Sequence, residues 1–191
     1  MTEKAPEPSG KLRETILLIG FMGGGKTSVG QSLAFRANVP FLDTDEMICE
    51  KEGRTIPTIF EQQGENAFRD METRLLRELV EEKENEKGAP EWTPQVISVG
   101  GGLPLREENR ELMHALGRVI YLKASPEVLE KRVEGDQSRP LLQGGDRHAK
   151  ILSLMAAREA IYEDAADISI LTDHMTVRET ARRILAMARS V

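Results

Sequence analysis

The sequence predicts an α/β fold, a doubly wound five-stranded parallel sheet with helices on both faces. Three observations lead to it. Short apolar, β-branched segments alternate along the chain with segments of helical period. A glycine-rich turn follows the first apolar segment and opens the first helical one. The length of 191 residues suits one domain that buries a core of its own.

Five segments have the composition of buried strands. Residues 15–19 form an almost unbroken apolar run, which is typical of a strand covered on both faces. Acidic residues end the second segment, and three glycines follow the third. The predicted strands are residues 15–19, 39–43, 96–99, 119–122 and 168–171. Ligands of such sheets bind at the carboxyl ends of the strands, so we expect the site at that edge.

Apolar side chains recur at helical spacing between the strands. Ser125 and Pro126 suit the first positions of one of these helices. The predicted helices are residues 27–37, 46–52, 57–63, 65–82, 106–116 and 125–133. Two later helices carry inward-facing apolar residues, which are Ile151, Leu154, Met155 and Ile161 in one and Val177, Ala181, Ile184, Leu185 and Ala188 in the other.

Composition restricts the partners. The net charge of −6 makes nucleic acid and anionic membrane surfaces poor partners, and no apolar run approaches the ~20 residues of a membrane span. A single cysteine, Cys49, forms no internal disulfide, which fits a reducing cytoplasm. Residues 1–13 read as a disordered tail and 14–191 as a single domain, with a charged loop at 83–94. We expect a cytoplasmic monomer.

The segment Gly20 to Thr27 fits the pattern G-x-x-x-x-G-K-[ST] between an apolar strand and an amphipathic helix. Glycines let successive N–H groups turn inward around a phosphate, and the helix adds its positive end. Lys26 is expected to reach the β- and γ-phosphates of ATP, and the Thr27 hydroxyl to hold one Mg²⁺. The predicted ATP-binding residues of this loop are Gly23, Gly24, Gly25, Lys26, Thr27 and Ser28.

Asp43 and Asp45 end the second predicted strand. If the backbone stays extended, their two carboxylates point the same way, and one can serve the metal while the other serves the substrate. The same residue types also favour the cap of a helix. The triplet alone leaves both interpretations open.

Two arginines and a glycine triplet are further candidates. Arg69 lies in the first turn of a predicted helix, where a cation opposes the macrodipole, so we interpret it as a bidentate partner for a carboxylate. Arg158 follows the same reasoning, and a solvated helix face is the alternative for both. Gly100 to Gly102 offers bare backbone to a ligand. Arg139 lies in the polar segment 135–147, which we interpret as a mobile lid.

With these motifs in order, the chain from about Thr15 to its C-terminus resembles the shikimate kinases. Several motifs in the same order identify a family more specifically than any single motif does. The motifs are Gly-x-Met-Gly-x-Gly-Lys-Thr at 20–27, Leu42 to Asp45, Gly64-Glu65-x-x-Phe68-Arg69, Gly100 to Gly102, Arg139 to Leu142, and Arg158 before Ile161-Tyr162. The resemblance implies the P-loop NTPase fold with strand order 2-3-1-4-5. It also implies phosphorylation of the 3-hydroxyl of shikimate by ATP with Mg²⁺, in aromatic amino-acid biosynthesis.

The resemblance assigns roles to individual residues. Lys26, Asp45 and Arg139 are the implied catalytic residues, and Asp45 accepts a hydrogen bond from the reacting hydroxyl. The implied substrate contacts are Asp45, Arg69, Gly101 and Arg158, with helices over about 44–82 forming the substrate region. Thr27 and Asp43 belong to the metal shell, and Arg132 packs on adenine. Lesser members of the pocket are Phe60, Phe68, Glu72, Pro140 and Leu141.

The chain departs from the family pattern in its charged insertion at 82–94 and its N-terminal tail, neither of which touches a matched motif. Two alternatives remain beside the resemblance. One is a related P-loop kinase for another small acid such as gluconate, or for a nucleoside monophosphate. The other is a regulatory module that binds a ligand without turnover. Two arginines with an aspartate favour a carboxylate-bearing polyol, and the intact Lys26, Asp43, Asp45 and Arg139 favour an enzyme.

Overall fold

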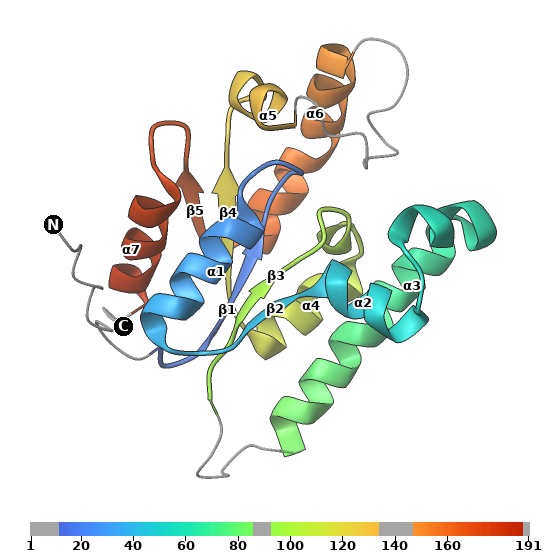
Figure 1. The fold of residues 1–191 in the computed structure, drawn as a ribbon, viewed down its shortest axis with the longest axis horizontal. Coiled ribbons are helices and arrows are strands. Elements are labelled where there is room, and N and C mark those ends of the chain that lie inside the picture. The colour runs from blue at the N-terminus through green and yellow to red at the C-terminus, as the bar shows by residue number, and fades with distance from the viewer. Residues whose placement is uncertain (1–11, 86–92, 134–146, 189–191) are drawn as a thin grey trace, which may run out of the picture.

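A computed structural model describes residues 12–85, 93–133 and 147–188. Its centre is the predicted five-stranded sheet (Figure 1). The strands are β1 (Thr15–Ile19), β2 (Phe41–Asp43), β3 (Val96–Ser98), β4 (Gly117–Lys123) and β5 (Ile168–Leu171). All neighbours are parallel, and the order β2-β3-β1-β4-β5 confirms the prediction.

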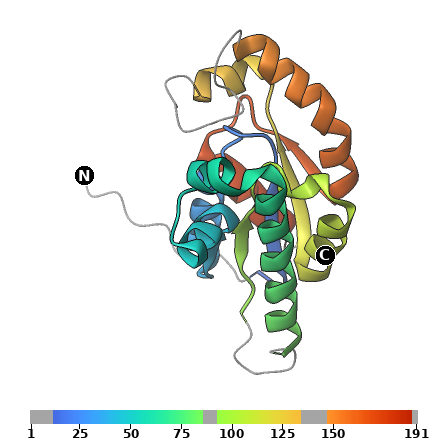
Figure 2. The same ribbon diagram turned by 90° about the vertical axis from the view of Figure 1, so that its right-hand side faces the viewer.

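Helices cover both faces of the sheet. They are α1 (Lys26–Ala37), α2 (Thr44–Glu52), α3 (Ile56–Asn85), α4 (Glu107–Leu116), α5 (Pro126–Val133), α6 (Arg147–Ala165) and α7 (Val177–Met187), with a short 3₁₀ helix, η1, at Leu103–Leu105. One core layer joins the sheet to α1 and α7, and the other joins it to α3, α4 and α6. In Figure 2, α3 and α6 lie on the side nearer the viewer.

The β1 strand explains both layers. Leu17 and Ile19 belong to the core with α3 and α6, whereas Ile16 and Leu18 belong to the core with α1 and α7. All four side chains are 0% exposed. Alternation in a strand sends successive side chains to opposite faces, so a strand buried on both faces has to be apolar throughout.

Helix α3 differs from its prediction in the middle and at its C-terminal end. Its two predicted halves form one helical run with a break at Gly64, where φ is 81° and ψ is 170°. The helix also continues to Asn85, beyond the predicted end at 82. Lys83 in this extra turn donates to the carbonyls of Ala115 and Leu116, both at 2.8 Å, and so satisfies the C-terminal end of α4.

Three side chains lie elsewhere than the apolar pattern indicated. Tyr162 is buried in α6, whereas its neighbour Ile161 is only half-buried. Val177, at the first position of α7, is 42% exposed because it lies at the rim of a cavity. Leu12, within the segment expected to be a tail, is 4% exposed and packs with α1 and α7. Residues 1–11 of that tail and residues 135–146 of the predicted lid lie outside the described residues.

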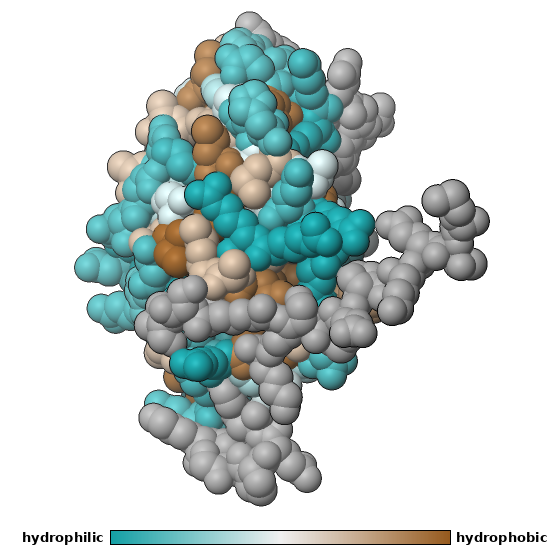
Figure 3. All heavy atoms as spheres, turned by 90° about the vertical axis from the view of Figure 1, so that its left-hand side faces the viewer, coloured by the Kyte–Doolittle hydropathy of each residue, from teal (hydrophilic) through white to brown (hydrophobic). Residues whose placement is uncertain are grey.

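The side of the molecule that carries α7 presents mainly hydrophilic residues, with hydrophobic ones between them (Figure 3). Partial burial, with Arg178 and Arg182 nearby, lowers the pKa of Arg36 on the neighbouring α1. In the described part of the chain, no helix combines the length and apolar character needed to cross a membrane.

Candidate active site

Two cavities adjoin at the carboxyl edge of the sheet. The first, of about 440 Å³, is lined by the glycine loop, the start of α1 and the start of α7. The second, of about 530 Å³, is lined mainly by α2, α3, the glycine triplet and α6. Met22, Asp45 and Gly101 line both. A ligand in one cavity therefore meets a ligand in the other at these three residues.

The glycine loop is shaped by left-handed backbone and close contacts. Gly25, with φ 88° and ψ 12°, precedes the first residue of α1. A Cβ on Gly20 would lie 2.7 Å from the Leu122 carbonyl, and one on Gly24 would lie 2.9 Å from the Phe21 carbonyl. The amide of Gly24 donates to that same carbonyl at 3.0 Å. Gly24 is thus part of a tight turn.

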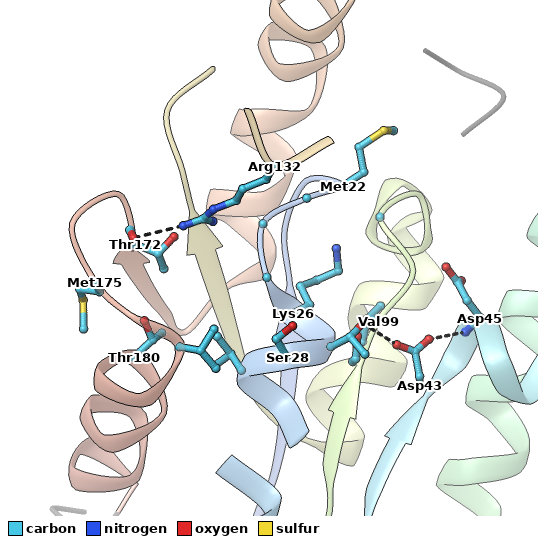
Figure 4. Close-up of a pocket in the computed structure, with 18 residues that line it drawn as sticks. Met22, Lys26, Ser28, Asp43, Asp45, Val99, Arg132, Thr172, Met175 and Thr180 are labelled. Atoms are coloured by element: carbon cyan, nitrogen blue, oxygen red, sulfur yellow. Dashed lines mark hydrogen bonds between the residues drawn. The ribbon is translucent and has the colours of Figure 1, made fainter. Parts of the chain in front are cut away.

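Lys26 is the first residue of α1 and points into the first cavity (Figure 4). Its ammonium donates to the carbonyls of Gly20 at 2.9 Å and Phe21 at 3.1 Å. The first turn of α1 contains no acidic residue. The cation and the N–H groups of the helix start together form an anion-binding surface.

Asp43 serves as both a cap and a partner of the loop. One of its oxygens accepts from the Asp45 backbone amide at 3.1 Å, and the other accepts from the Thr27 hydroxyl at 3.0 Å. The condition that the backbone stays extended through this triplet was wrong, because α2 begins at Thr44. Both carboxylates still line the first cavity, since the first helical turn directs them there (Figure 4).

Arg69 is held by carboxylates of its own helix. It is 9% exposed and donates to Glu72 at 2.7 Å and to Glu65 at 2.8 Å. Burial alone would lower the pKa of Arg69, but the two carboxylates outweigh it and raise the pKa. A cation is unfavourable in the first turn after Gly64 because it opposes the helix macrodipole, and the negative charges of Glu65 and Glu72 offset this effect.

Glu72 lies deepest in the second cavity. Its side chain is 0% exposed, and Oε1 has no hydrogen-bond partner among the described residues. Burial raises the pKa of this carboxyl to about 7, although Arg69 acts against the rise, and the nearby Asp45 adds to it. A carboxyl next to a second carboxyl in a low-dielectric cavity resists ionisation.

The glycine triplet makes room for the protein's own side chains. A Cβ on Gly100 would lie 2.5 Å from Asp45 Oδ1 and 3.0 Å from Glu72 Oε1. A Cβ on Gly102 would lie 2.2 Å from the guanidinium carbon of Arg69. At Gly101 the nearest atom would be 3.5 Å away. Two of the three glycines are therefore required by side chains of the site, and Gly101 faces both cavities.

Arg158 completes the charged lining of the second cavity. It is 8% exposed, which excludes the solvated helix face that was its alternative. Arg69 and Arg158 line this cavity together with the aromatic rings of Phe60 and Phe68. The cavity thus combines two guanidinium groups with an apolar wall, which suits a small carboxylic acid with a carbon ring.

Comparison with known proteins decides the family. A family model described as shikimate kinase matches residues 22–189. The chain is 42% identical to a shikimate kinase of Neisseria meningitidis over 171 residues, which cover 89% of this chain and 93% of the relative. It is 42% identical to one of Enterococcus faecalis, covering 90% and 96%. The chain belongs to the shikimate kinase family.

A solved structure extends this family assignment to the fold. The shikimate kinase from Acinetobacter baumannii, in complex with shikimate, aligns with a TM-score of 0.82 and 37% identity. The alignment covers 91% of this chain and 92% of that one. The doubly wound sheet and the P-loop expected from the sequence are therefore those of a shikimate kinase.

Several residues that line the first cavity had no role assigned from the sequence. Thr172, Met175 and Thr180 line the first cavity opposite the glycine loop (Figure 4). Arg132 lies among them, with Nη2 3.5 Å from the Thr172 carbonyl. Their common signal is their place after β5 and at the start of α7. Cys49, the single cysteine of the chain, lines the second cavity, and burial raises its thiol pKa.

Three of the predicted site residues belong to the lid segment. Arg139, Pro140 and Leu141 lie outside the described residues. The described candidates divide between the two cavities. Gly23, Gly24, Gly25, Lys26, Thr27, Ser28, Asp43 and Arg132 line the first, Arg69 and Arg158 line the second, and Asp45 and Gly101 line both.

Proposed function

We infer that this chain transfers the γ-phosphate of ATP to the 3-hydroxyl of shikimate, giving shikimate 3-phosphate and ADP. The observation that carries this inference is the junction of the two cavities at Asp45. An anion-binding loop lies on one side of that carboxylate, and a pair of buried arginines lies on the other. Family membership supports shikimate as the acid.

The first cavity suits the nucleotide. Lys26 and the N–H groups of the loop face the phosphates, and Ser28 lies beside them in the same turn of α1. Arg132, with its guanidinium near the Thr172 carbonyl, is the proposed partner of adenine. Stacking of a planar guanidinium on a base is a common arrangement.

One Mg²⁺ fits the corner formed by Thr27 and Asp43. Their oxygens lie 3.0 Å apart and belong to the cavity wall, and hard oxygen donors are what Mg²⁺ prefers. The described residues contain no group of three or more acidic, histidine or cysteine side chains around a metal site. That agrees with an ion that takes most of its ligands from phosphates and water, and that neutralises charge on the transferred group.

The second cavity suits the acid. Arg69 and Arg158 offer parallel N–H pairs to the carboxylate of shikimate, and Gly101 offers its backbone. Held this way, the acid directs a hydroxyl toward Asp45. Alignment of the two reactants supplies much of the rate enhancement in phosphoryl transfer.

The reaction itself forms one bond and breaks one. The hydroxyl oxygen of shikimate bonds to the γ-phosphorus as the bond to the β,γ-bridging oxygen breaks, and the electron pair leaves with ADP. Asp45 orients the hydroxyl and takes its proton, while Lys26 meets the charge on the phosphate oxygens. Arg139 in the predicted lid remains a proposed third cation on that group.

A coupled ADP-release assay tests this function. Shikimate, quinate, gluconate and AMP are offered as acceptors at equal concentration with MgATP. We expect the largest kcat/KM with shikimate. Faster ADP release with gluconate or AMP would mean that the chain is a kinase for that acceptor. If no acceptor causes ADP release, the chain is a binding module without turnover.

The proposed form of the enzyme is a cytoplasmic monomer. Residues of a single chain line both cavities. Light scattering at the concentration of the kinetic assay measures the mass directly, and a dimer mass would replace this part of the proposal.

A further inference from the structure

We call the first cavity the nucleotide cavity and the second the acid cavity. Tyr162 contacts two residues of the acid cavity, although it is not among the residues that line either cavity. Its side chain is 1% exposed, and its ring packs against the ring of Tyr121 at a centroid distance of 5.2 Å. Its hydroxyl donates to the Gly101 carbonyl at 2.5 Å. The tyrosine therefore reaches from the core to the backbone of the glycine triplet.

The same hydroxyl also meets Arg158. The two residues are one turn apart on α6, on the same side of the helix. Burial raises the pKa of Tyr162, and the positive charge of Arg158, together with its side-chain hydrogen bond, acts against the rise. A guanidinium can only donate, so Arg158 faces the acceptor side of the hydroxyl oxygen. The hydroxyl proton goes to the Gly101 carbonyl.

This arrangement exceeds what burial of a tyrosine requires. A buried hydroxyl needs one partner to satisfy it, and the Gly101 carbonyl alone would do so. Here the hydroxyl has two partners, both of which line the acid cavity, and they come from different elements. Gly101 follows β3 and also borders the nucleotide cavity, whereas Arg158 lies on α6.

We propose that Tyr162 is a positioning residue that fixes Arg158 relative to Gly101 and so sets the width of the carboxylate clamp. The clamp has two halves. Arg69 is fixed by Glu72 and Glu65 on its own helix. Arg158 has no such carboxylate in the hydrogen bonds and ion pairs found among the described residues. The tyrosine hydroxyl fixes Arg158 instead. The proposal rests on the proposed function, because the clamp is taken to hold shikimate.

The first test is Tyr162→Phe, which removes one oxygen and keeps the ring in the core. We expect the KM for shikimate to rise about tenfold, the size of one lost hydrogen bond to a charged group. The KM for ATP should stay within about twofold, because Arg158 is not among the residues that line the nucleotide cavity. The matched control is Tyr121→Phe, which removes a hydroxyl from the ring packed against Tyr162 and should leave both KM values unchanged.

The second test does not need turnover. The chain has two tyrosines, so labelling with ¹³C at tyrosine Cζ gives two signals, and Tyr121→Phe assigns them. Arg158→Lys should move the Tyr162 signal and leave that of Tyr121 in place, because only Tyr162 shares its hydroxyl with the arginine. Adding shikimate to wild-type protein should also move the Tyr162 signal.

The outcomes separate the two proposals. If wild-type protein fails to phosphorylate shikimate but Arg158→Lys moves the Tyr162 signal, the function is wrong and the positioning role stands. An unmoved Tyr162 signal in Arg158→Lys overturns the positioning role whatever the activity. A shikimate KM in Tyr162→Phe within about twofold of wild type also overturns it, as does an equal rise in the KM for ATP.

Discussion

The nucleotide cavity and the acid cavity are built from different parts of the chain. The nucleotide cavity takes its anion-binding surface from consecutive residues, Gly23 to Ser28, and largely from their backbone. The acid cavity takes side chains from α2, α3 and α6, with backbone from the segment after β3. A site made of local backbone depends on one motif, whereas a site made of distant side chains depends on packing. Substitutions in the two cavities should therefore affect different kinetic constants.

The largest effect is expected in the nucleotide cavity. Lys26→Ala removes its cation from the phosphates, and we expect kcat to fall about a thousandfold. The melting temperature should change little, because the side chain points into the cavity and not into the core. Steady-state kinetics and circular dichroism measure both. Near wild-type kcat would remove Lys26 from the catalytic group.

Asp45 lies where the two cavities meet, so its replacement should affect chemistry more than binding. Asp45→Asn keeps a hydrogen-bond acceptor but cannot take the proton. We expect kcat to fall about a hundredfold, with a much smaller rise in the KM for shikimate. If kcat is unchanged, Asp45 only belongs to the first turn of α2.

The acid cavity should respond in KM. Arg69→Lys and Arg158→Lys keep the charge but lose bidentate geometry, and each should raise the KM for shikimate about ten- to a hundredfold. The KM for ATP should change little. The double variant should cost less than the product of the two, because both arginines hold one carboxylate. An amide analogue of shikimate should be nearly indifferent to either change, and equal losses for acid and amide would contradict the clamp.

A glycine substitution distinguishes packing in the acid cavity from stability. Gly102→Ala places a Cβ 2.2 Å from the Arg69 guanidinium, which is the movable end of a side chain. We expect the KM for shikimate to rise about tenfold with a small loss of stability. The control is Gly53→Ala, where φ is +63° and nothing lies within 4 Å of the new Cβ. It should cost about 1 kcal/mol of unfolding free energy and leave KM unchanged.

The smallest effect is a pH dependence of stability in the acid cavity. The Glu72 pKa is about 7 in the folded protein against an ordinary value of 4.5. A raised pKa stabilises the fold below pH ~4.5, and this contribution is lost as the pH rises through about 7. The unfolding free energy of wild type minus that of Glu72→Gln should therefore decrease from pH 5 to 8. A difference that stays flat over this range would mean that Arg69 keeps Glu72 ionised in the folded protein.

The sequence by itself determined the parallel five-stranded sheet and the nucleotide loop. Both depend on local information, such as the apolar run of β1 or the spacing from Gly20 to Thr27. The order of the strands came from the family resemblance, and the structure confirms it. The sequence also indicated Arg69 and Arg158 as partners of a carboxylate, although position alone was equally compatible with an arginine on a solvated helix face. The family resemblance favoured the carboxylate partner.

Only the tertiary structure decided how the acid cavity holds its charges. The reason is that burial and distance between remote residues have no signature in a local pattern. Nothing in the local pattern around Glu72 and Tyr162 shows their contacts, and only the family resemblance marked them. In the structure Glu72 is 0% exposed beside Arg69, and Tyr162 reaches Gly101 across 61 positions. The need for glycine at Gly102 likewise arises from the Arg69 side chain of another element. Side-chain packing at long range sets these relations, and the folded chain is needed to define it.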